Sequence, residues 1–370
     1  MQIAQLGNQA LELRRDGASS LVLPFLWLRD NCPTAFDPQT GERNFDLLSV
    51  PDDLKPASVE IEGDRLVIAW PDGHVSRFEH SWLLAHRPGV ARPDAAALPR
   101  KLWRAADLPQ LPRFPGAQIL ADDRALLDFL VTTQSLGLAL VDGLAPEQGL
   151  EVAGRIGFLR ETNFGKVFDV ISKPDPNNLA YTAQALALHT DLANQEIPPG
   201  FQFLHCIANE AQGGGSIFAD SFAIAEDLRE TDQEAFRILS TVTLPFRFHD
   251  RAYDIRLRRA VITLHPDGSL DEIRYNAHLT DVIDLPADQL GSFYRAYRAF
   301  MKRTRDPAFV VATRLRGGEM VVFDNRRTLH GRQAFNPATG FRQLQGCYVD
   351  RGEFESRIRV LDAQGCGALP

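Results

Sequence analysis

The stretch YTAQALALHTD, residues 181–191, places a histidine and an aspartate two positions apart. On an extended strand, the side chains of residues i and i+2 point to the same face. His189 and Asp191 are therefore predicted to hold one metal ion together. Two ligands do not complete a metal site, so at least one more ligand must come from elsewhere in the chain.

His330 is the predicted third ligand among the nine histidines of the chain. It follows the apolar run MVVF, residues 320–323, and a polar turn, so it stands at the exit of a predicted strand. Its separation from His189 is too long for a zinc finger but suits two strands that face each other in a barrel. Two histidines and one carboxylate form the facial triad of non-haem Fe(II) oxygenases, which leaves coordination positions open. A zinc hydrolase could use the same three residues.

Two polar residues downstream of these ligands form a candidate anion site. The glycine run 213–215 leads into Ser216, and Arg342 begins the predicted strand RQLQG. A guanidinium can bind a carboxylate through two parallel hydrogen bonds, and a serine hydroxyl can add a third. An ordinary surface ion pair is the alternative interpretation of Arg342.

The pattern beyond Gly157 is mainly that of short strands joined by long loops, with helical inserts over residues 223–239 and 286–301. Many strands with few helices favour a mainly β, α+β fold, with a double-stranded β-helix of the jelly-roll type as its catalytic core. A parallel doubly wound sheet is disfavoured, because strands do not alternate with helices.

The chain divides into three parts by pattern and composition. Residues 1–90 form a small β-rich domain in which short alternating segments are separated by Gly63-Asp64 and Asp72-Gly73 turns. Residues 91–116 are rich in proline and are predicted to be a linker. Residues 117–370 are predicted to be the catalytic domain.

Charge and composition exclude several classes of partner. The net charge is -8 with no basic run to offset it, which opposes nucleic-acid binding. No apolar stretch approaches the roughly 20 residues that a membrane span needs. The four cysteines are far apart, as expected for reduced thiols, and no signal peptide is apparent. We therefore expect a cytoplasmic protein without nucleic-acid or membrane partners.

These motifs resemble the taurine-dioxygenase-like Fe(II)/2-oxoglutarate oxygenases, and within them the γ-butyrobetaine and trimethyllysine hydroxylase branch. The resemblance includes HTD at 189–191, GGGS at 213–216, HGR at 330–332 and LWLRDNCP at 26–33, and it covers nearly the whole chain. It implies a jelly roll that binds Fe(II) through the three ligands and 2-oxoglutarate through Arg342 and Ser216. Dioxygen is the implied oxidant, and relatives are usually homodimers.

The resemblance also implies a box of aromatic rings around a trimethylammonium group. The matching residues are Phe164, Phe168, Tyr181 and Tyr348. A quaternary cation cannot donate a hydrogen bond, so ring faces hold it through cation–π attraction, worth about 0.5 to 2 kcal/mol per contact. The family more often has Tyr and Trp where this chain has its two phenylalanines, so the substrate or its affinity is expected to differ.

Two amides match the residues that bind the far end of the substrate in that branch, Asn178 and Asn276. They favour an anionic end, so γ-butyrobetaine, which would be hydroxylated to carnitine, is the expected substrate. The same amides could meet a phosphonate, which leaves 2-trimethylaminoethylphosphonate as the alternative. Trimethyllysine is disfavoured, because an acidic group tends to occupy the position of Asn178 in its hydroxylases. A non-catalytic binding or sensor protein is a rival of another class, against which the complete ligand set argues.

Animal relatives carry a structural zinc in the N-terminal domain, held by three cysteines and a histidine. Cys32 and His74 match two of these ligands, but Thr34 and the Phe36-Asp37 pair stand where further thiolates are needed. Structural zinc requires a complete four-ligand set. We therefore expect no zinc, with hydrophobic packing of Trp27, Leu48 and Trp70 stabilising the domain instead.

Overall fold

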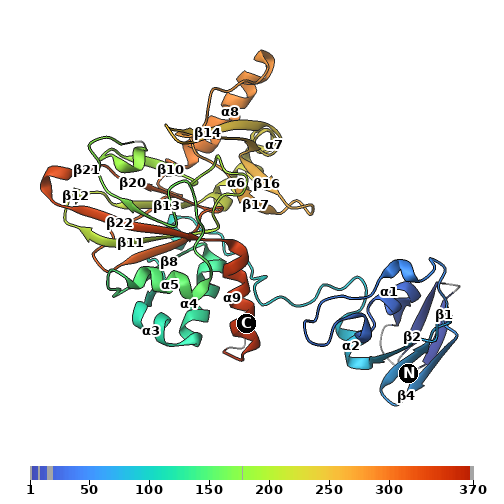
Figure 1. Cartoon of the computed structure of the whole chain (residues 1–370). Coiled ribbons are helices and arrows are strands. Elements are labelled where there is room, and N and C mark those ends of the chain that lie inside the picture. Colours follow the sequence, from blue (N-terminus) through green and yellow to red (C-terminus); the bar gives the residue numbers. More distant parts are fainter. Residues whose placement is uncertain (1, 7–8, 15–19, 177, 367–370) are drawn as a thin grey trace. The chain divides into compact units, whose positions relative to one another are not determined.

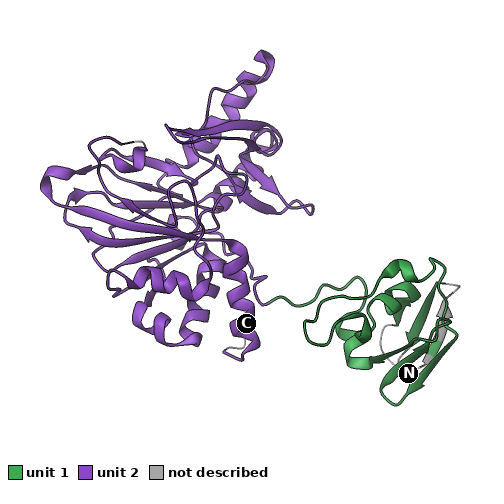
Figure 2. Ribbon diagram, in the orientation of Figure 1, with its two compact units in different colours: residues 1–94 green, residues 95–370 purple. Residues whose placement is uncertain are grey.

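The computed structural model describes residues 2–6, 9–14, 20–176 and 178–366. The chain forms two compact units, residues 1–94 and 95–370 (Figure 2). Within the described residues, no helix is long and apolar enough to cross a membrane. The predicted boundaries of the domains and the linker remain a prediction, and each unit is described by itself.

The N-terminal unit consists of two three-stranded antiparallel sheets and two short helices (Figure 1). The first sheet contains β1 (Gln2–Leu6), β2 (Ala10–Arg14) and β3 (Leu21–Pro24). The second is a meander of β4 (Ser58–Glu62), β5 (Arg65–Ala69) and β6 (Val75–Glu79). Its two turns use Gly63 and Gly73, which have positive φ angles of 62° and 86° that favour glycine. The helices are α1 (Phe25–Asp30) and α2 (His80–Ala85).

The core of this unit only partly matches the predicted packing. Trp70 is buried and Trp27 packs against the same cluster, as expected. Leu48 is 93% exposed, so the prediction for this residue is wrong. It lies in a 3-10 turn (Leu47–Ser49) whose backbone is capped by the Asp46 carboxylate, and this turn buries none of its side chains.

The second unit is built around a six-stranded sheet of order β7-β8-β19-β11-β22-β9 and a four-stranded sheet of order β10-β20-β13-β18. All neighbours are antiparallel except β7 and β8. The strands of the larger sheet are β7 (Arg113–Pro115), β8 (Leu138–Asp142), β9 (Val167–Val170), β11 (Phe201–Asn209), β19 (Met320–Asp324) and β22 (Arg342–Val349). Those of the smaller sheet are β10 (Leu186–His189), β13 (Ser216–Asp220), β18 (Val311–Thr313) and β20 (Thr328–Arg332).

The two sheets pack face to face through an apolar layer, which confirms the predicted jelly roll. Leu204 and Phe323 from the larger sheet share this layer with Phe218 from the smaller one. The other face of the larger sheet is covered by helices (Figure 1), so its central strands are apolar on both faces. These helices are α3 (Gly116–Ala121), α4 (Asp123–Leu136), α5 (Gln148–Ile156) and α9 (Arg351–Ala363).

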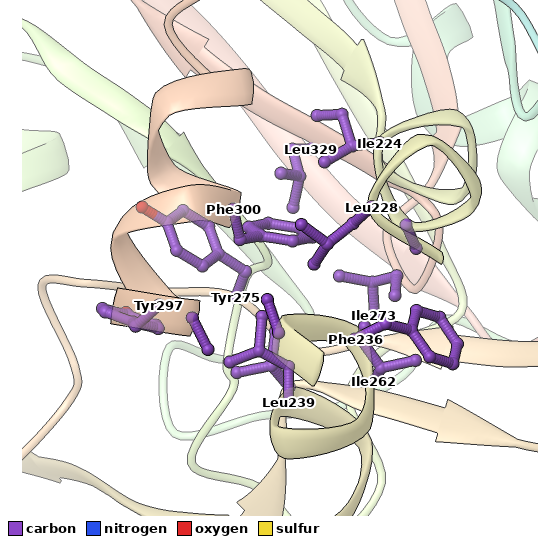
Figure 3. Close-up of a cluster of buried hydrophobic side chains, with 14 of the residues drawn as sticks. Ile224, Leu228, Phe236, Leu239, Ile262, Ile273, Tyr275, Tyr297, Phe300 and Leu329 are labelled. Carbon is purple, nitrogen blue, oxygen red and sulfur yellow. The ribbon is translucent and has the colours of Figure 1, made fainter. Parts of the chain in front are cut away.

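The segment between β13 and β18 forms a helical insert with its own core (Figure 3), in which Phe300 and Tyr275 pack against Leu228 and Ile273. The insert contains α6 (Ser221–Thr231), α7 (Gln233–Thr241), β14 (Thr243–His249), β15 (Asp254–Ala260), β16 (Ile262–Leu264), β17 (Leu270–Ile273) and α8 (Ala287–Arg303). The helix predicted over residues 223–239 is two helices. Asp232 ends α6 and caps α7, because its side chain accepts a hydrogen bond from the backbone N–H of Ala235.

The short elements that remain connect the sheets. They are β12 (Gln212–Gly213), β21 (Phe335–Asn336) and the 3-10 turns Pro33–Ala35, Ala105–Asp107, Leu179–Tyr181 and Pro337–Thr339. Part of the proline-rich segment belongs structurally to the second unit. Trp103 and Leu108 are buried against its sheets, and β7 pairs with β8.

Candidate active site

The three predicted metal ligands converge between neighbouring strands of the smaller sheet. His189 on β10 lies directly opposite His330 on β20 in the antiparallel register, and their ring centroids are 4.3 Å apart. Together with Asp191, they place one ligand atom each within 4.8 Å of the others. In the part of the chain that the structure describes, no other group of three His, Cys, Asp or Glu residues meets this condition.

Asp191 reaches the site by a different route from the one predicted. The strand β10 ends at His189, so Asp191 is not on a strand, and the next residue, Leu192, has a positive φ of 53°. The Asn325 side chain holds this turn: its Oδ1 accepts from the Asp191 backbone N–H at 2.7 Å, and its Nδ2 donates to the Asp191 carbonyl at 3.1 Å. A buried amide, rather than the i, i+2 strand geometry, therefore fixes the backbone that carries this carboxylate.

A second clamp fixes the backbone that follows Asp191. The Arg274 guanidinium donates hydrogen bonds to the carbonyl oxygens of Ala193, Gln195 and Glu196. It is itself held by Glu272 at 2.8 Å. Neither Arg274 nor Asn325 was identified from the sequence, because each contacts the loop from a distant segment of the chain.

The protonation states of Asp191 and His330 suit a divalent metal. Burial would raise the pKa of the Asp191 carboxyl, but His330, His189 and a hydrogen bond from Tyr348 lower it well below its usual range. Burial, reinforced by His189, lowers the pKa of His330 to about 3. The Nδ1 of His189 lies 2.8 Å from the Ala187 carbonyl, which leaves Nε2 free to bind a metal. An ionised carboxylate and a neutral imidazole are the forms that metal ligation requires.

The triad opens into a cavity of about 420 Å³. This cavity is lined by all the residues that the sequence and the resemblance nominated: Phe164, Phe168, Asn178, Tyr181, His189, Asp191, Ser216, Asn276, His330, Arg342 and Tyr348. They come from both sheets, the 164–181 segment and the insert. The structure therefore gathers every predicted site residue around one space, although their individual roles remain predictions.

Arg342 is a buried cation among the residues that line this cavity. It is 5% exposed, donates one hydrogen bond to the Gly214 carbonyl at 3.3 Å, and leaves its Nε without a partner. Among the described residues, no carboxylate lies within ion-pairing distance of it. Gly214 is required here, because its φ is +69° and a Cβ would lie 2.9 Å from the Arg342 Nε. Burying an unpaired charge is costly, so this guanidinium fits an anion supplied from outside the chain.

Arg332 is a second buried arginine in the cavity, and the sequence did not nominate it. It lies on β20 two residues beyond His330 and donates hydrogen bonds to the carbonyls of Ala180, Thr182 and Gln184. Burial lowers its pKa to about 10. These bonds hold the segment that leads from the aromatic wall into β10. The i, i+2 spacing from His330 was the available signal for its position.

The predicted aromatic residues line the same cavity, and we call them the aromatic wall. The Phe168 and Tyr348 rings lie 5.1 Å apart, and Phe164 packs edge-on against Phe248 at 5.3 Å. The Phe168 ring fits because residue 346 is glycine, where a Cβ would lie 2.3 Å from the ring. The Tyr348 hydroxyl donates a hydrogen bond to Asp191 Oδ2 at 2.8 Å.

The two predicted substrate-binding amides differ in how many hydrogen bonds they already make with the protein. Asn276 donates to the Thr190 carbonyl, and its Oδ1 accepts from the backbone N–H groups of His278 and Leu279. Asn178 uses only its Oδ1, which accepts from the Ala180 N–H. Within the described residues, the N–H groups of Asn178 are therefore the freer donors.

Comparison with known proteins identifies the family. Residues 95–348 match the "Taurine catabolism dioxygenase TauD, TfdA family", and residues 3–84 match "Gamma-butyrobetaine hydroxylase-like, N-terminal". The chain is 43% identical to gamma-butyrobetaine dioxygenase of Pseudomonas sp. (strain AK-1), over 93% of this chain and 92% of the relative. It is 33% identical to mitochondrial trimethyllysine dioxygenase of Gallus gallus, over 97% and 88%.

The fold comparison agrees with this identification. A solved asparagine oxygenase matches with a TM-score of 0.51 at 17% identity, covering 64% of this chain and 93% of that one. That likeness shows the fold alone, whereas the sequence matches extend over the whole site. The chain therefore belongs to the TauD, TfdA family and is an Fe(II)- and 2-oxoglutarate-dependent dioxygenase, with His189, Asp191 and His330 as its metal-binding triad.

Proposed function

We propose that the protein hydroxylates γ-butyrobetaine to carnitine, with 2-oxoglutarate and dioxygen as cosubstrates. The observation that carries this proposal is a single cavity in which the metal triad faces both an unpaired buried arginine and a wall of aromatic rings. The 43% identity to a gamma-butyrobetaine dioxygenase supports the choice of substrate.

The part of the cavity lined by the triad, Arg342 and Ser216 serves the cosubstrate. Iron held by the triad would, together with 2-oxoglutarate and dioxygen, oxidise an unactivated C–H bond to an alcohol. Arg342 binds the far carboxylate of 2-oxoglutarate, because it is buried without an anion and makes a single hydrogen bond to the chain, whereas the guanidinium of Arg332 already donates to three carbonyl oxygens. Ser216, which begins β13 and lines the same space, adds a hydroxyl donor.

The aromatic wall holds the trimethylammonium group. The rings of Phe164, Phe168, Tyr181 and Tyr348 line the cavity and can attract a cation without the hydrogen bond that a quaternary ammonium cannot donate. The Tyr181 ring already attracts a cation in this way, because the Lys173 ammonium lies 3.6 Å from its centroid. Two of these rings belong to phenylalanine, whose face attracts a cation less strongly than that of tryptophan. Hydrophobic contact of the substrate methyl groups with Phe168 and Phe164 supplies the rest of the binding free energy at this end of the substrate.

The anionic end of the substrate meets Asn178. Its free N–H groups suit a carboxylate, whereas Asn276 contributes at most one N–H because its other atoms bind the backbone. With both ends of a short chain held, one methylene is presented to the metal, and this positioning is the main contribution of the protein to the reaction.

The test is a comparison of three substrates with the iron-loaded enzyme. Succinate formation and hydroxylated product are measured with γ-butyrobetaine, 2-trimethylaminoethylphosphonate and trimethyllysine at saturating 2-oxoglutarate. We expect the highest kcat/KM with γ-butyrobetaine. A higher value with either other compound would replace the proposed substrate, and product with none of them would overturn the proposal.

We also propose that the protein is a cytoplasmic homodimer with a zinc-free N-terminal domain (1–90), a linker (91–116) and a catalytic domain (117–370). The support is the resemblance to usually dimeric relatives and the widely spaced cysteines, which are all free thiols among the described residues. Light scattering on the purified protein tests the dimer, and limited proteolysis tests the boundaries. A monomeric mass at micromolar concentration would contradict the dimer.

A further inference from the structure

We propose that Tyr348 is a positioning residue for the metal ligand Asp191, in addition to being part of the aromatic wall. Its hydroxyl fixes the carboxylate so that only one oxygen is presented to the metal. This inference rests on the proposed function of the cavity and extends it from binding to ligand geometry.

The two oxygens of Asp191 have different partners. Oδ1 lies 3.1 Å from His189 Nε2 and 3.7 Å from His330 Nε2, so it is the oxygen that faces both imidazoles. Oδ2 accepts the hydrogen bond from the Tyr348 hydroxyl at 2.8 Å. The oxygen that Tyr348 takes up is therefore the one turned away from the histidine pair.

This division of the carboxylate has a chemical consequence. A carboxylate that bound the metal through both oxygens would take a coordination position that the reaction needs for 2-oxoglutarate or dioxygen. A facial triad is useful because it leaves positions open. With Oδ2 engaged by Tyr348, a one-oxygen mode is favoured, and the open positions are kept.

The surroundings of Tyr348 hold its ring in place. It lies on β22 opposite Gln202 of β11, is 2% exposed, and stacks obliquely on Phe168. An ionised carboxylate only accepts hydrogen bonds, so the Tyr348 hydroxyl is the donor in this contact. The backbone of Asp191 is fixed independently by Asn325, so the Tyr348 contact controls the rotation of the carboxylate and not the path of the chain.

The ring and the hydroxyl of Tyr348 thus have separable tasks. The ring contributes to the cavity wall and affects binding of the cationic substrate. The hydroxyl affects the metal. Replacing Tyr348 with phenylalanine keeps the first and removes the second.

The experiment compares wild-type protein with Tyr348→Phe. Metal affinity is measured by titrating Co(II) into the chelator-treated protein, and the anaerobic Fe(II)–2-oxoglutarate charge-transfer band is recorded. Loss of a hydrogen bond to a metal ligand typically costs about 10- to 100-fold in metal affinity or activity. We expect weaker Co(II) binding, an altered band and a lower kcat, with KM for the quaternary ammonium substrate nearly unchanged.

Tyr297→Phe is the matched control, because it removes a tyrosine hydroxyl buried in the helical insert (Figure 3) and outside the cavity. It should leave the Co(II) affinity and the band as in the wild type. If Tyr348→Phe behaves like this control, or loses kcat with no change in Co(II) affinity or band, the proposal is wrong. Co(II) binding and the band need no substrate, so they test Tyr348 even if γ-butyrobetaine is not turned over.

Discussion

Two polar clusters, one in each unit, both contain histidine but differ in the other side chains that they could offer to a metal. In the catalytic unit, His189, Asp191 and His330 bring their ligand atoms within 4.8 Å. In the N-terminal unit, Cys32 Sγ lies 3.1 Å from Thr34 Oγ1 and 3.4 Å from His74 Nε2. The second cluster consists of a cysteine, a threonine and a histidine, whereas the first contains an ionised carboxylate.

Ligand charge and the surrounding residues explain this difference. Asp191 is ionised, and Asn325 and Tyr348 aim it at the histidines. At His74, burial and the nearby Arg29 guanidinium both lower the pKa of the imidazole. Arg29 is paired with Asp72 at 3.2 Å, and this carboxylate acts in the opposite direction on the His74 pKa. The N-terminal cluster therefore differs from the triad mainly in having no carboxylate among its own side chains.

The largest effect is expected from His189→Ala. One of three ligands is lost, so we expect both hydroxylation and substrate-dependent succinate formation to disappear, with metal affinity reduced. Product analysis by mass spectrometry and a Co(II) titration measure this. His265→Ala is the control, because its histidine lies in a turn and faces Asp271 at 3.8 Å outside the cavity. Turnover at the wild-type rate in His189→Ala would show that the triad is not the catalytic metal site.

Arg342→Met should have the next largest effect. Hydrogen bonds to charged groups are worth about 1.5 to 3 kcal/mol each, so KM for 2-oxoglutarate is expected to rise about 10- to 150-fold. No carboxylate among the described residues depends on Arg342, so the substitution leaves no buried acid unpaired. Initial rates over a range of 2-oxoglutarate concentrations measure the change.

The control for Arg342 is Arg314→Met. Arg314 also donates to backbone carbonyls, those of Asn209 and Ala211, but it does not line the active-site cavity. Its substitution should leave KM for 2-oxoglutarate unchanged. Equal effects of the two substitutions would assign Arg342 a structural role only.

Tyr181→Ala should have a smaller and more selective effect. Removing one cation–π contact of about 0.5 to 2 kcal/mol is expected to raise KM for γ-butyrobetaine about 2- to 30-fold and to leave KM for 2-oxoglutarate nearly unchanged. Steady-state kinetics with each substrate varied in turn measure the two values. Tyr253→Ala, which alters an exposed tyrosine of the insert, is the control. A parallel rise in both KM values would contradict a role in the cationic end of the cavity.

The contents of the catalytic site could be predicted from the sequence because they depend on residue type and order. The ligands His189, Asp191 and His330 belong to two short motifs, and apolar runs predicted neighbouring strands such as β19 and β22. The strand that carries His330, β20, was not predicted, because this histidine was expected in a turn at the exit of the preceding strand. The arrangement of strands in a jelly roll then brings distant motifs together. The same reasoning placed Arg342 at the cavity.

The parts that could not be predicted depend on contacts between distant segments. Asp191 lies beyond the end of its strand because Asn325 hydrogen-bonds to its backbone, and no local pattern reports such a bond. Arg332 and Arg274 hold loops through carbonyl oxygens, which any loop of any sequence can offer. Leu48 is exposed because a capped turn directs it outward, although its residue type predicted burial.

The smallest effect is expected in the N-terminal cluster, and it tests the other half of the comparison. Cys32 is 1% exposed, and Cys32→Ala removes its weak hydrogen bonds to Thr34 and His74. We expect a loss of about 1 kcal/mol in the stability of the unit and no change in bound zinc, because the cluster lacks a complete ligand set. Thermal unfolding and elemental analysis of chelator-washed wild-type and variant protein measure both. Stoichiometric zinc in the wild type that disappears in Cys32→Ala would contradict the expectation of a zinc-free domain. It would show that Cys32 binds zinc together with ligands from outside the cluster, despite the nearby charge of Arg29.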